Sequence, residues 1–212
     1  MRNLFIALFA AAAVMHLASI FAVRDRVRKI TKICLLPLLL GVYLTSAKNF
    51  FAAVLLAIIF DWGGDVLLLR SEDKRFFRLG LVSFLLGHLC YLMTLFRFTG
   101  TFNVTVLVVS AAAASAFGLL VLHVINPARD MRTPVIVYMV VIELMSLGSL
   151  QLLLYRGDVT GAAVFGGSLC FLFSDTVLAY YLFRSFPKYG NALVMLPYIL
   201  AQTGIVWGLA AV

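Results

Sequence analysis

The chain has 212 residues, of which 64% are hydrophobic and 12% are charged. Soluble domains are nearer half apolar and a quarter charged, so this composition is typical of a polytopic membrane protein. The net charge of +8 could suggest a nucleic-acid partner, but the basic residues are confined to short connections between apolar segments. We therefore expect no nucleic-acid partner and a single all-α transmembrane bundle over residues 1–212.

Eight apolar segments are candidates for membrane-spanning helices, because about 20 apolar residues cross a bilayer as a helix. In chain order they cover residues 3–23, 33–47, 50–69, 79–97, 104–125, 134–155, 162–184 and 192–212. The second segment is the shortest. A basic run follows residues 1–22 directly, so we expect a retained first helix and not a cleaved signal peptide.

Basic residues gather in every second connection between these segments. Most of the 17 lysines and arginines lie between the first and second, third and fourth, fifth and sixth, and seventh and eighth segments. The positive-inside rule then predicts cytoplasmic basic connections and both termini on the non-cytoplasmic side. We expect an integral protein of a bacterial inner membrane whose basic connections contact anionic lipid headgroups.

Four acidic residues lie inside apolar segments: Asp61, Asp65, Glu143 and Asp175. A carboxyl group in hydrocarbon costs several kcal/mol by most estimates, so it is rarely found there without a partner or a function. We expect no buried lysine or arginine to accompany these acids, since Arg97 and Arg184 lie at the ends of their segments. A shared function is therefore the stronger interpretation.

Depth along the predicted helices groups the acids with other polar side chains. Asp61, His88, Glu143 and Asp175 lie about nine residues from the predicted cytoplasmic helix ends, or roughly 14 Å at 1.5 Å per residue. Asp65 lies about one turn in, and Tyr198 and Gln202 fall at similar depths. This grouping predicts one internal cavity that opens toward the cytoplasmic leaflet.

Spacing within helices supports a common direction for these groups. Residues three or four apart share a helix face. Pairs at this spacing are Asp61 with Asp65, His88 with Tyr91, and Tyr198 with Gln202. Gly63 and Gly64 separate the two aspartates and allow close approach of another helix or a ligand.

Carboxyl groups that share a dry pocket cannot all ionise, so one can serve as general acid and another as general base. This pair suits hydrolysis through an oxocarbenium-like state. Acyl transfer is disfavoured, since no Ser–His–acid constellation is evident and Ser174 beside Asp175 is a weak candidate. One histidine among hard oxygens makes a poor zinc site, and Cys34, Cys90 and Cys170 lie in separate segments. We expect no metal and no cofactor.

Five stretches resemble the YhhN-type lysoplasmalogenase family. They are Phe60–Leu69 (FDWGGDVLLL), Gly80–Tyr91 (GLVSFLLGHLCY), Tyr138–Met145 (YMVVIELM), Phe171–Ala179 (FLFSDTVLA) and Tyr198–Gln202 (YILAQ). A Gly-Asp pair followed by leucines, then Gly-His-x-x-Tyr, then Ser-Asp, is specific as a combination. Family members often have Lys-Pro where this chain has Lys32-Ile33, with a proline only at Pro37.

The resemblance implies hydrolysis of the vinyl ether bond of a lysoplasmalogen, which reaches the cavity from the membrane. Asp175 or Asp65 would donate the proton, and another acid would activate water. The expected catalytic residues are Asp65, Asp175, Asp61, His88 and Glu143. The expected substrate-binding residues are Tyr91, Tyr138, Tyr198, Gln202 and Ser174.

Two other classes of protein remain open at this stage. Intramembrane acids also relay protons in transporters, whose folds often contain internal repeats. Only a faint repeat exists here, between Asp65-Val-Leu-Leu and Asp175-Thr-Val-Leu. A receptor-like or scaffolding bundle would instead leave the acids paired inside a packed interior.

Overall fold

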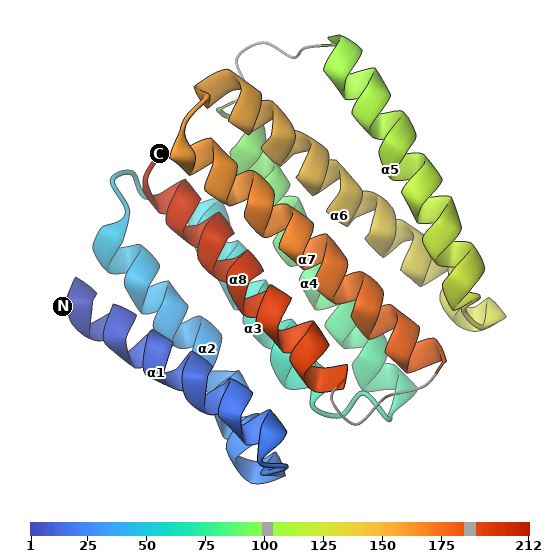
Figure 1. Ribbon diagram of the computed structural model, residues 1–212, viewed down its shortest axis with the longest axis horizontal. Coiled ribbons are helices and arrows are strands. Elements are labelled where there is room, and N and C mark those ends of the chain that lie inside the picture. Colours follow the sequence, from blue (N-terminus) through green and yellow to red (C-terminus); the bar gives the residue numbers. More distant parts are fainter. Residues whose placement is uncertain (99–103, 185–189) are drawn as a thin grey trace.

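A computed structural model describes residues 1–98, 104–184 and 190–212. These residues form eight α-helices and no strand, which confirms the all-α expectation. The helices are α1 (Arg2–Phe21), α2 (Asp25–Ser46), α3 (Ala52–Leu68), α4 (Lys74–Phe96), α5 (Val104–Ile125), α6 (Arg129–Arg156), α7 (Val159–Phe183) and α8 (Gly190–Ala210). They run alternately up and down the bundle, so both termini lie at one end (Figure 1).

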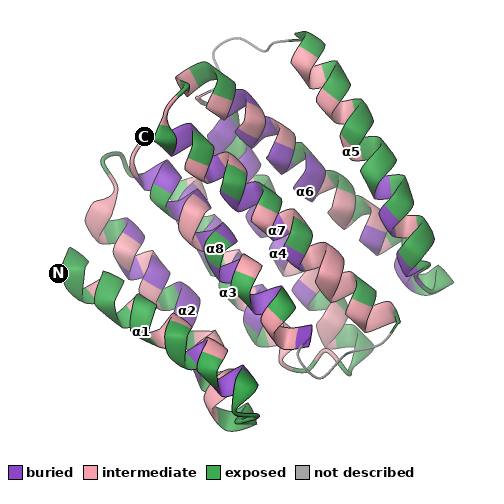
Figure 2. Cartoon of the chain, in the orientation of Figure 1, coloured by how far each residue is buried: buried purple, intermediate pink, exposed green. Residues whose placement is uncertain are grey.

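The helices pack in two layers around a shared interior. Helices α7 and α8 lie in front of α3 and α4, the α1–α2 hairpin covers one flank, and α6 and then α5 complete the other (Figure 1). Buried residues concentrate where these layers meet, while α1 and α5 are exposed along most of their length (Figure 2). The buried polar groups of α3, α4, α7 and α8 therefore face one interior.

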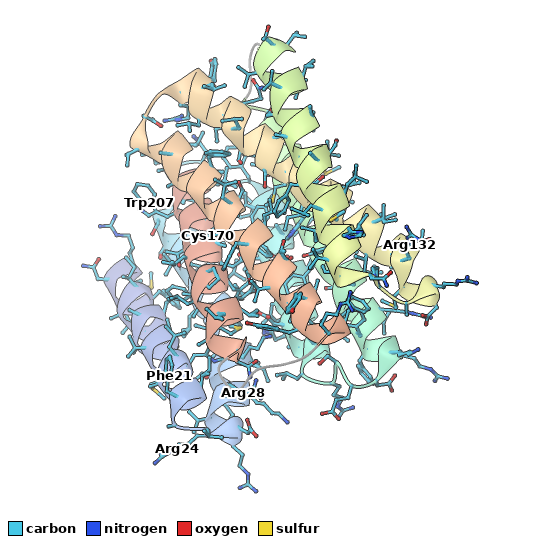
Figure 3. The ribbon with its side chains drawn as sticks, turned by 45° about the vertical axis from the view of Figure 1, so that its right-hand side comes forward. Phe21, Arg24, Arg28, Arg132, Cys170 and Trp207 are labelled. Atoms are coloured by element: carbon cyan, nitrogen blue, oxygen red, sulfur yellow. The ribbon has the colours of Figure 1, made fainter. Side chains whose placement is uncertain are left out.

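Within the described residues, six helices are long and apolar enough to cross a membrane, namely α1 and α4 to α8. Helix α3 has 17 residues, and α2 begins with two charged turns. This composition identifies an integral membrane protein. Arg24, Arg28 and Arg132 lie at the end of the bundle opposite the termini (Figures 1 and 3), as the charge pattern requires. Which end faces the cytoplasm stays a prediction.

Helix α2 begins at Asp25, and the prediction that it begins at residue 33 is wrong. The basic run is part of the helix, because Asp25 in the first turn favours a helix start electrostatically and pairs with Arg28 at 3.2 Å. Helices α4 and α6 also begin earlier than predicted, at Lys74 and Arg129. Charged residues end the apolar pattern without ending the helix.

A proline inside α2 is compensated by a tryptophan of α3. Pro37 has no backbone N–H, so the carbonyl of Ile33 one turn earlier loses its helical partner. Trp62 Nε1 donates to that carbonyl oxygen at 2.9 Å. This contact joins α2 to α3 and fixes the entry of α2 beside Lys32.

Helices α7 and α8 pack through glycines. A Cβ atom on Gly167 would lie 2.9 Å from the carbonyl oxygen of Ala201, and one on Gly204 would lie 2.8 Å from that of Ala163. Backbone atoms cannot yield as a flexible side chain can, so only glycine permits this approach. Small residues at helix interfaces have this function in membrane proteins generally.

The connection between α6 and α7 is fixed by Asp158. Its side chain pairs with Arg156 at 2.8 Å and accepts the backbone N–H of Gly161 at 2.9 Å. The Arg156 guanidinium and this N–H hold the pKa of Asp158 at about 2. The tight connection sets the pairing of the two helices that carry Tyr138 and Asp175.

Candidate active site

A cavity with a volume of about 80 Å³ lies inside the bundle. All helices from α2 to α8 contribute to its lining, which is mostly apolar. The polar lining residues are Lys32, Asp65, Tyr138, Ser174, Asp175, Thr176 and Tyr198. Phe77, Ile125 and Phe183 also line it, so the cavity lies toward the end with the basic connections.

Asp65 on α3 is held by residues of α2 and α8. Lys32 Nζ lies 3.2 Å from Oδ1 of Asp65, and the Tyr198 hydroxyl donates to Oδ2 at 2.6 Å. Asp65 is 2% exposed, whereas the Lys32 side chain is 16% exposed. Both oxygens have partners and one partner is a cation, the arrangement that stabilises a buried carboxylate.

Asp175 on α7 meets side chains of α6 and α4. The Tyr138 hydroxyl donates to Oδ2 of Asp175 and lies 3.3 Å from Nε2 of His88. The same His88 nitrogen lies 4.0 Å from Asp175 Oδ2, and the Asp175 side chain is 16% exposed. The carboxyl is therefore oriented by a hydroxyl and remains accessible from the cavity.

Aromatic rings join the two carboxyl groups into one wall. Phe171 packs edge-on against His88, with centroids 4.5 Å apart, and against Tyr198 at 5.5 Å. Phe84 packs edge-on against Tyr198 at 6.3 Å. Edge-to-face packing at these distances is favourable and restricts ring rotation. The rings thus hold the hydroxyl of Tyr198 and the imidazole of His88 in place.

Asp61 lies one turn before Asp65 on α3 but does not line the cavity. Its Oδ2 accepts a hydrogen bond from Nε2 of Gln202 at 2.6 Å, and the Tyr91 hydroxyl donates to Oε1 of Gln202 at 3.1 Å. Its Oδ1 has no hydrogen-bond partner. A Cβ atom on Gly87 would collide with that oxygen, so α4 covers Asp61 closely.

Glu143 and Ser174 occupy different positions relative to the cavity. Oε1 of Glu143 is buried without a hydrogen-bond partner beside Gly118 of α5, and Glu143 does not line the cavity. Ser174 lines it, but its hydroxyl donates to the carbonyl oxygen of Val194 at 2.9 Å and so joins α7 to α8. The structure thus brings Asp65, Asp175, Tyr138, Tyr198 and Ser174 together around one space. His88 does not line it, but contacts Tyr138 and Asp175.

Lys32 is the site residue that the sequence did not predict. The expectation that no basic residue accompanies the acids is wrong, because Lys32 lies on α2 and not in a connection. A signal existed: Lys32 is followed at helical spacing by Leu36, Leu39 and Tyr43, which are all buried. Continuing that face one turn toward the N-terminus includes Lys32.

No ligand set for a metal is evident within residues 1–98, 104–184 and 190–212. None of their His, Cys, Asp and Glu residues form a group of three or more that could hold a metal ion. The polar groups that line the cavity are carboxyls, phenols, aliphatic hydroxyls and an ammonium, and the imidazole of His88 contacts one of the phenols. This set can move protons and stabilise a cation without a further group.

Comparison with known proteins identifies one match. The family model described as "YhhN family" matches residues 27–209, which include every residue that lines the cavity. This confirms the resemblance that the five sequence stretches indicate. No curated protein and no solved structure matches the chain.

Proposed function

Since the chain belongs to the YhhN family, we propose that it is an integral-membrane hydrolase that cleaves the vinyl ether bond of lysoplasmalogens. The products are a fatty aldehyde and a glycerophospho-choline or glycerophospho-ethanolamine. Water is the co-substrate, and the proposal includes no metal or cofactor.

One observation carries this proposal: two carboxyl groups, Asp65 and Asp175, line the same apolar cavity, each with a tyrosine hydroxyl as hydrogen-bond donor. Hydrolysis of a vinyl ether needs an acid that protonates carbon and a base that activates water. It also passes through an oxocarbenium ion, which a nearby carboxylate stabilises. Carboxyl pairs meet these needs in glycoside hydrolysis, which has a related transition state.

The reaction balances with two carboxyl groups. The acid gives its proton to the alkenyl carbon that does not carry oxygen, and the π electrons form the new C–H bond. Water adds to the resulting oxocarbenium carbon and gives a proton to the base. The hemiacetal then collapses: the protonated base donates to the glycerol oxygen, and the ionised acid takes the hydroxyl proton. Both groups return to their starting states.

The cavity also has the polarity that a lysolipid requires. Apolar side chains from α4 to α7 would contact the hydrocarbon chain, among them Leu81, Val121, Met139, Leu178 and Leu182. Helix α5 is the most exposed helix that contributes to the lining, so we propose that the chain enters from the bilayer beside it. The headgroup phosphate would lie toward the basic connections.

Roles for the other predicted residues follow their positions. Tyr138 and Tyr198 would orient the carboxyls and the substrate, His88 would act through its contact with Tyr138, and Ser174 lines the wall where α7 meets α8. Asp61 with Gln202 and Tyr91 forms a hydrogen-bonded group away from the cavity. Catalytic roles for Asp61 and Glu143 stay predictions that the variants below test.

The decisive experiment measures aldehyde release from a lysoplasmalogen by the purified protein in detergent or lipid. We expect release by the wild type and none above background from the matched lysolipid with a saturated ether. Folded wild-type protein that releases no aldehyde would refute the substrate. Uptake of a solute into vesicles, coupled to protons, would favour the transporter instead.

A further inference from the structure

The two carboxyl groups of the cavity have unequal surroundings. Asp65 contacts the ammonium group of Lys32 at 3.2 Å, whereas Asp175 contacts a phenol and lies 4.0 Å from an imidazole nitrogen. We propose that Lys32 is a positioning residue that keeps Asp65 ionised, so that Asp65 is the base and Asp175 the proton donor. This assignment of roles rests on the proposed function.

Charge balance limits the cavity to one carboxylate. Among the residues that the structure describes, Lys32 is the only Lys or Arg whose side chain lines the cavity. A buried charge without a counter-ion is costly, and each ionised carboxyl in apolar surroundings needs its own partner. The ammonium contact identifies Asp65 as the group that is ionised, so Asp175 retains its proton.

His88 cannot serve as a second cation. It is fully buried and packs against Phe171 and Tyr138. Its Nδ1 has no hydrogen-bond partner, and an imidazolium would require acceptors for two N–H groups. With a neutral His88, Asp175 has no cation in direct contact among the described residues, in agreement with a protonated donor.

The assignment completes the proton cycle. Protonated Asp175 gives its proton to the alkenyl carbon, and the Asp65 carboxylate then takes a proton from the attacking water. During collapse of the hemiacetal, Asp65 gives that proton to the glycerol oxygen, and Asp175 takes the proton of the hydroxyl group. Lys32 keeps its charge throughout, and its contact with Asp65 is restored when Asp65 is ionised again.

Carbodiimide labelling tests the assignment without relying on activity. Protonated carboxyl groups in apolar surroundings add to dicyclohexylcarbodiimide, and mass spectrometry locates the adduct. We expect an adduct on Asp175 and little on Asp65 in the wild type, and at least a fivefold gain on Asp65 in Lys32→Met. Equal labelling of Asp65 in both proteins, or its preferential labelling in the wild type, would overturn the proposal.

Activity gives a second readout with a matched control. We expect Lys32→Met to lower kcat about a hundredfold, the lower range for loss of general acid–base catalysis, with KM changed less. Lys32→Arg retains the charge and should recover most of the rate. Lys29→Met removes an exposed lysine of the same helix and should stay within about twofold of the wild type.

The outcomes separate the two proposals. If no protein releases aldehyde but Asp65 gains its adduct in Lys32→Met, the substrate is wrong and the charge assignment stands. If the wild type releases aldehyde while Lys32→Met and Lys29→Met have equal rates, the role of Lys32 is wrong and the proposed function stands. If Lys32→Met does not fold, the wild type alone tests the charge assignment: more adduct on Asp175 than on Asp65 supports it, and more on Asp65 overturns it.

Discussion

The four intramembrane acids fall into two pairs that differ in access to the cavity. Asp65 and Asp175 line it, and each accepts a hydrogen bond from a tyrosine hydroxyl. Asp61 and Glu143 do not line it, and each has one buried oxygen without a hydrogen-bond partner. We therefore expect contact with the cavity, and not burial alone, to distinguish the carboxyls that take part in the reaction from those that only pack.

The difference between Asp61 and Asp65 arises within one helical turn. Both lie on the face of α3 toward α4 and α8, but Gly87 lets α4 close over Asp61. Beside Gly64, the larger ring of Phe84 packs against α3 and also lines the cavity near Asp65. Helix α4 therefore covers Asp61 at Gly87, whereas the ring of Phe84 leaves Asp65 in contact with the cavity.

The largest expected effect comes from the cavity pair. Asp65→Asn and Asp175→Asn each remove a proton carrier with little change in shape, so we expect kcat to fall at least about a thousandfold, within the range of general acid–base catalysis. Aldehyde release under saturating lysoplasmalogen measures this. A folded variant of either residue that keeps more than a tenth of the wild-type rate would contradict the assignment of the pair.

The tyrosines should have an intermediate effect. Tyr198→Phe removes a hydrogen bond to the Asp65 carboxylate, worth about 1.5–3 kcal/mol for a charged acceptor, so a loss of about tenfold to a hundredfold is expected. Tyr138→Phe removes one to the protonated Asp175, worth about 0.5–1.5 kcal/mol for a neutral pair, so a loss of about twofold to tenfold is expected. Tyr91→Phe is the matched control, because its hydroxyl contacts Gln202 and not a carboxyl. Equal losses in all three variants would mean that the hydroxyls act on the fold and not on the carboxyls.

The acids away from the cavity should matter little for turnover. Asp61→Asn keeps an oxygen that can accept from Gln202, and Glu143→Gln keeps the shape beside Gly118. We expect both to stay within about threefold of the wild-type kcat, the effect of slight repacking and far below the range for a lost acid or base. A hundredfold loss in either variant would instead return that residue to the catalytic group that the sequence predicts.

The sequence predicts the fold class well, because apolar runs of sufficient length allow few alternatives in a membrane. It also indicates five of the residues that line the cavity, namely Asp65, Asp175, Tyr138, Tyr198 and Ser174, which are polar groups in apolar helices. Depth along a helix does not say in which direction a side chain points, so depth alone groups Glu143 with the residues of the cavity. Direction around the helix then places Glu143 toward α5.

Lys32 illustrates the opposite error. A basic residue at the edge of an apolar run is usually assigned to a connection, as the positive-inside rule encourages. The extension of α2 to Asp25 gives Lys32 a direction as well as a depth. Its long side chain can then reach Asp65 on the neighbouring helix. The ends of the helices, where charged residues can still be partly buried, are thus the part of this site that the sequence predicts least well.

The smallest expected effects concern the glycines that cover the acids. A Cβ atom at Gly87 would collide with Oδ1 of Asp61, whose other oxygen is fixed by Gln202, so we expect Gly87→Ala to cost about 1–3 kcal/mol of stability. At Gly118 the added atom would meet the flexible ends of Glu143 at 2.7 Å and Met139 at 3.1 Å. Those ends can move aside, so we expect Gly118→Ala to cost less than about 1 kcal/mol, since alanine also favours the helix. Thermal unfolding of both variants in detergent measures the difference, and a larger loss at Gly118 would mean that Glu143 is held as firmly as Asp61.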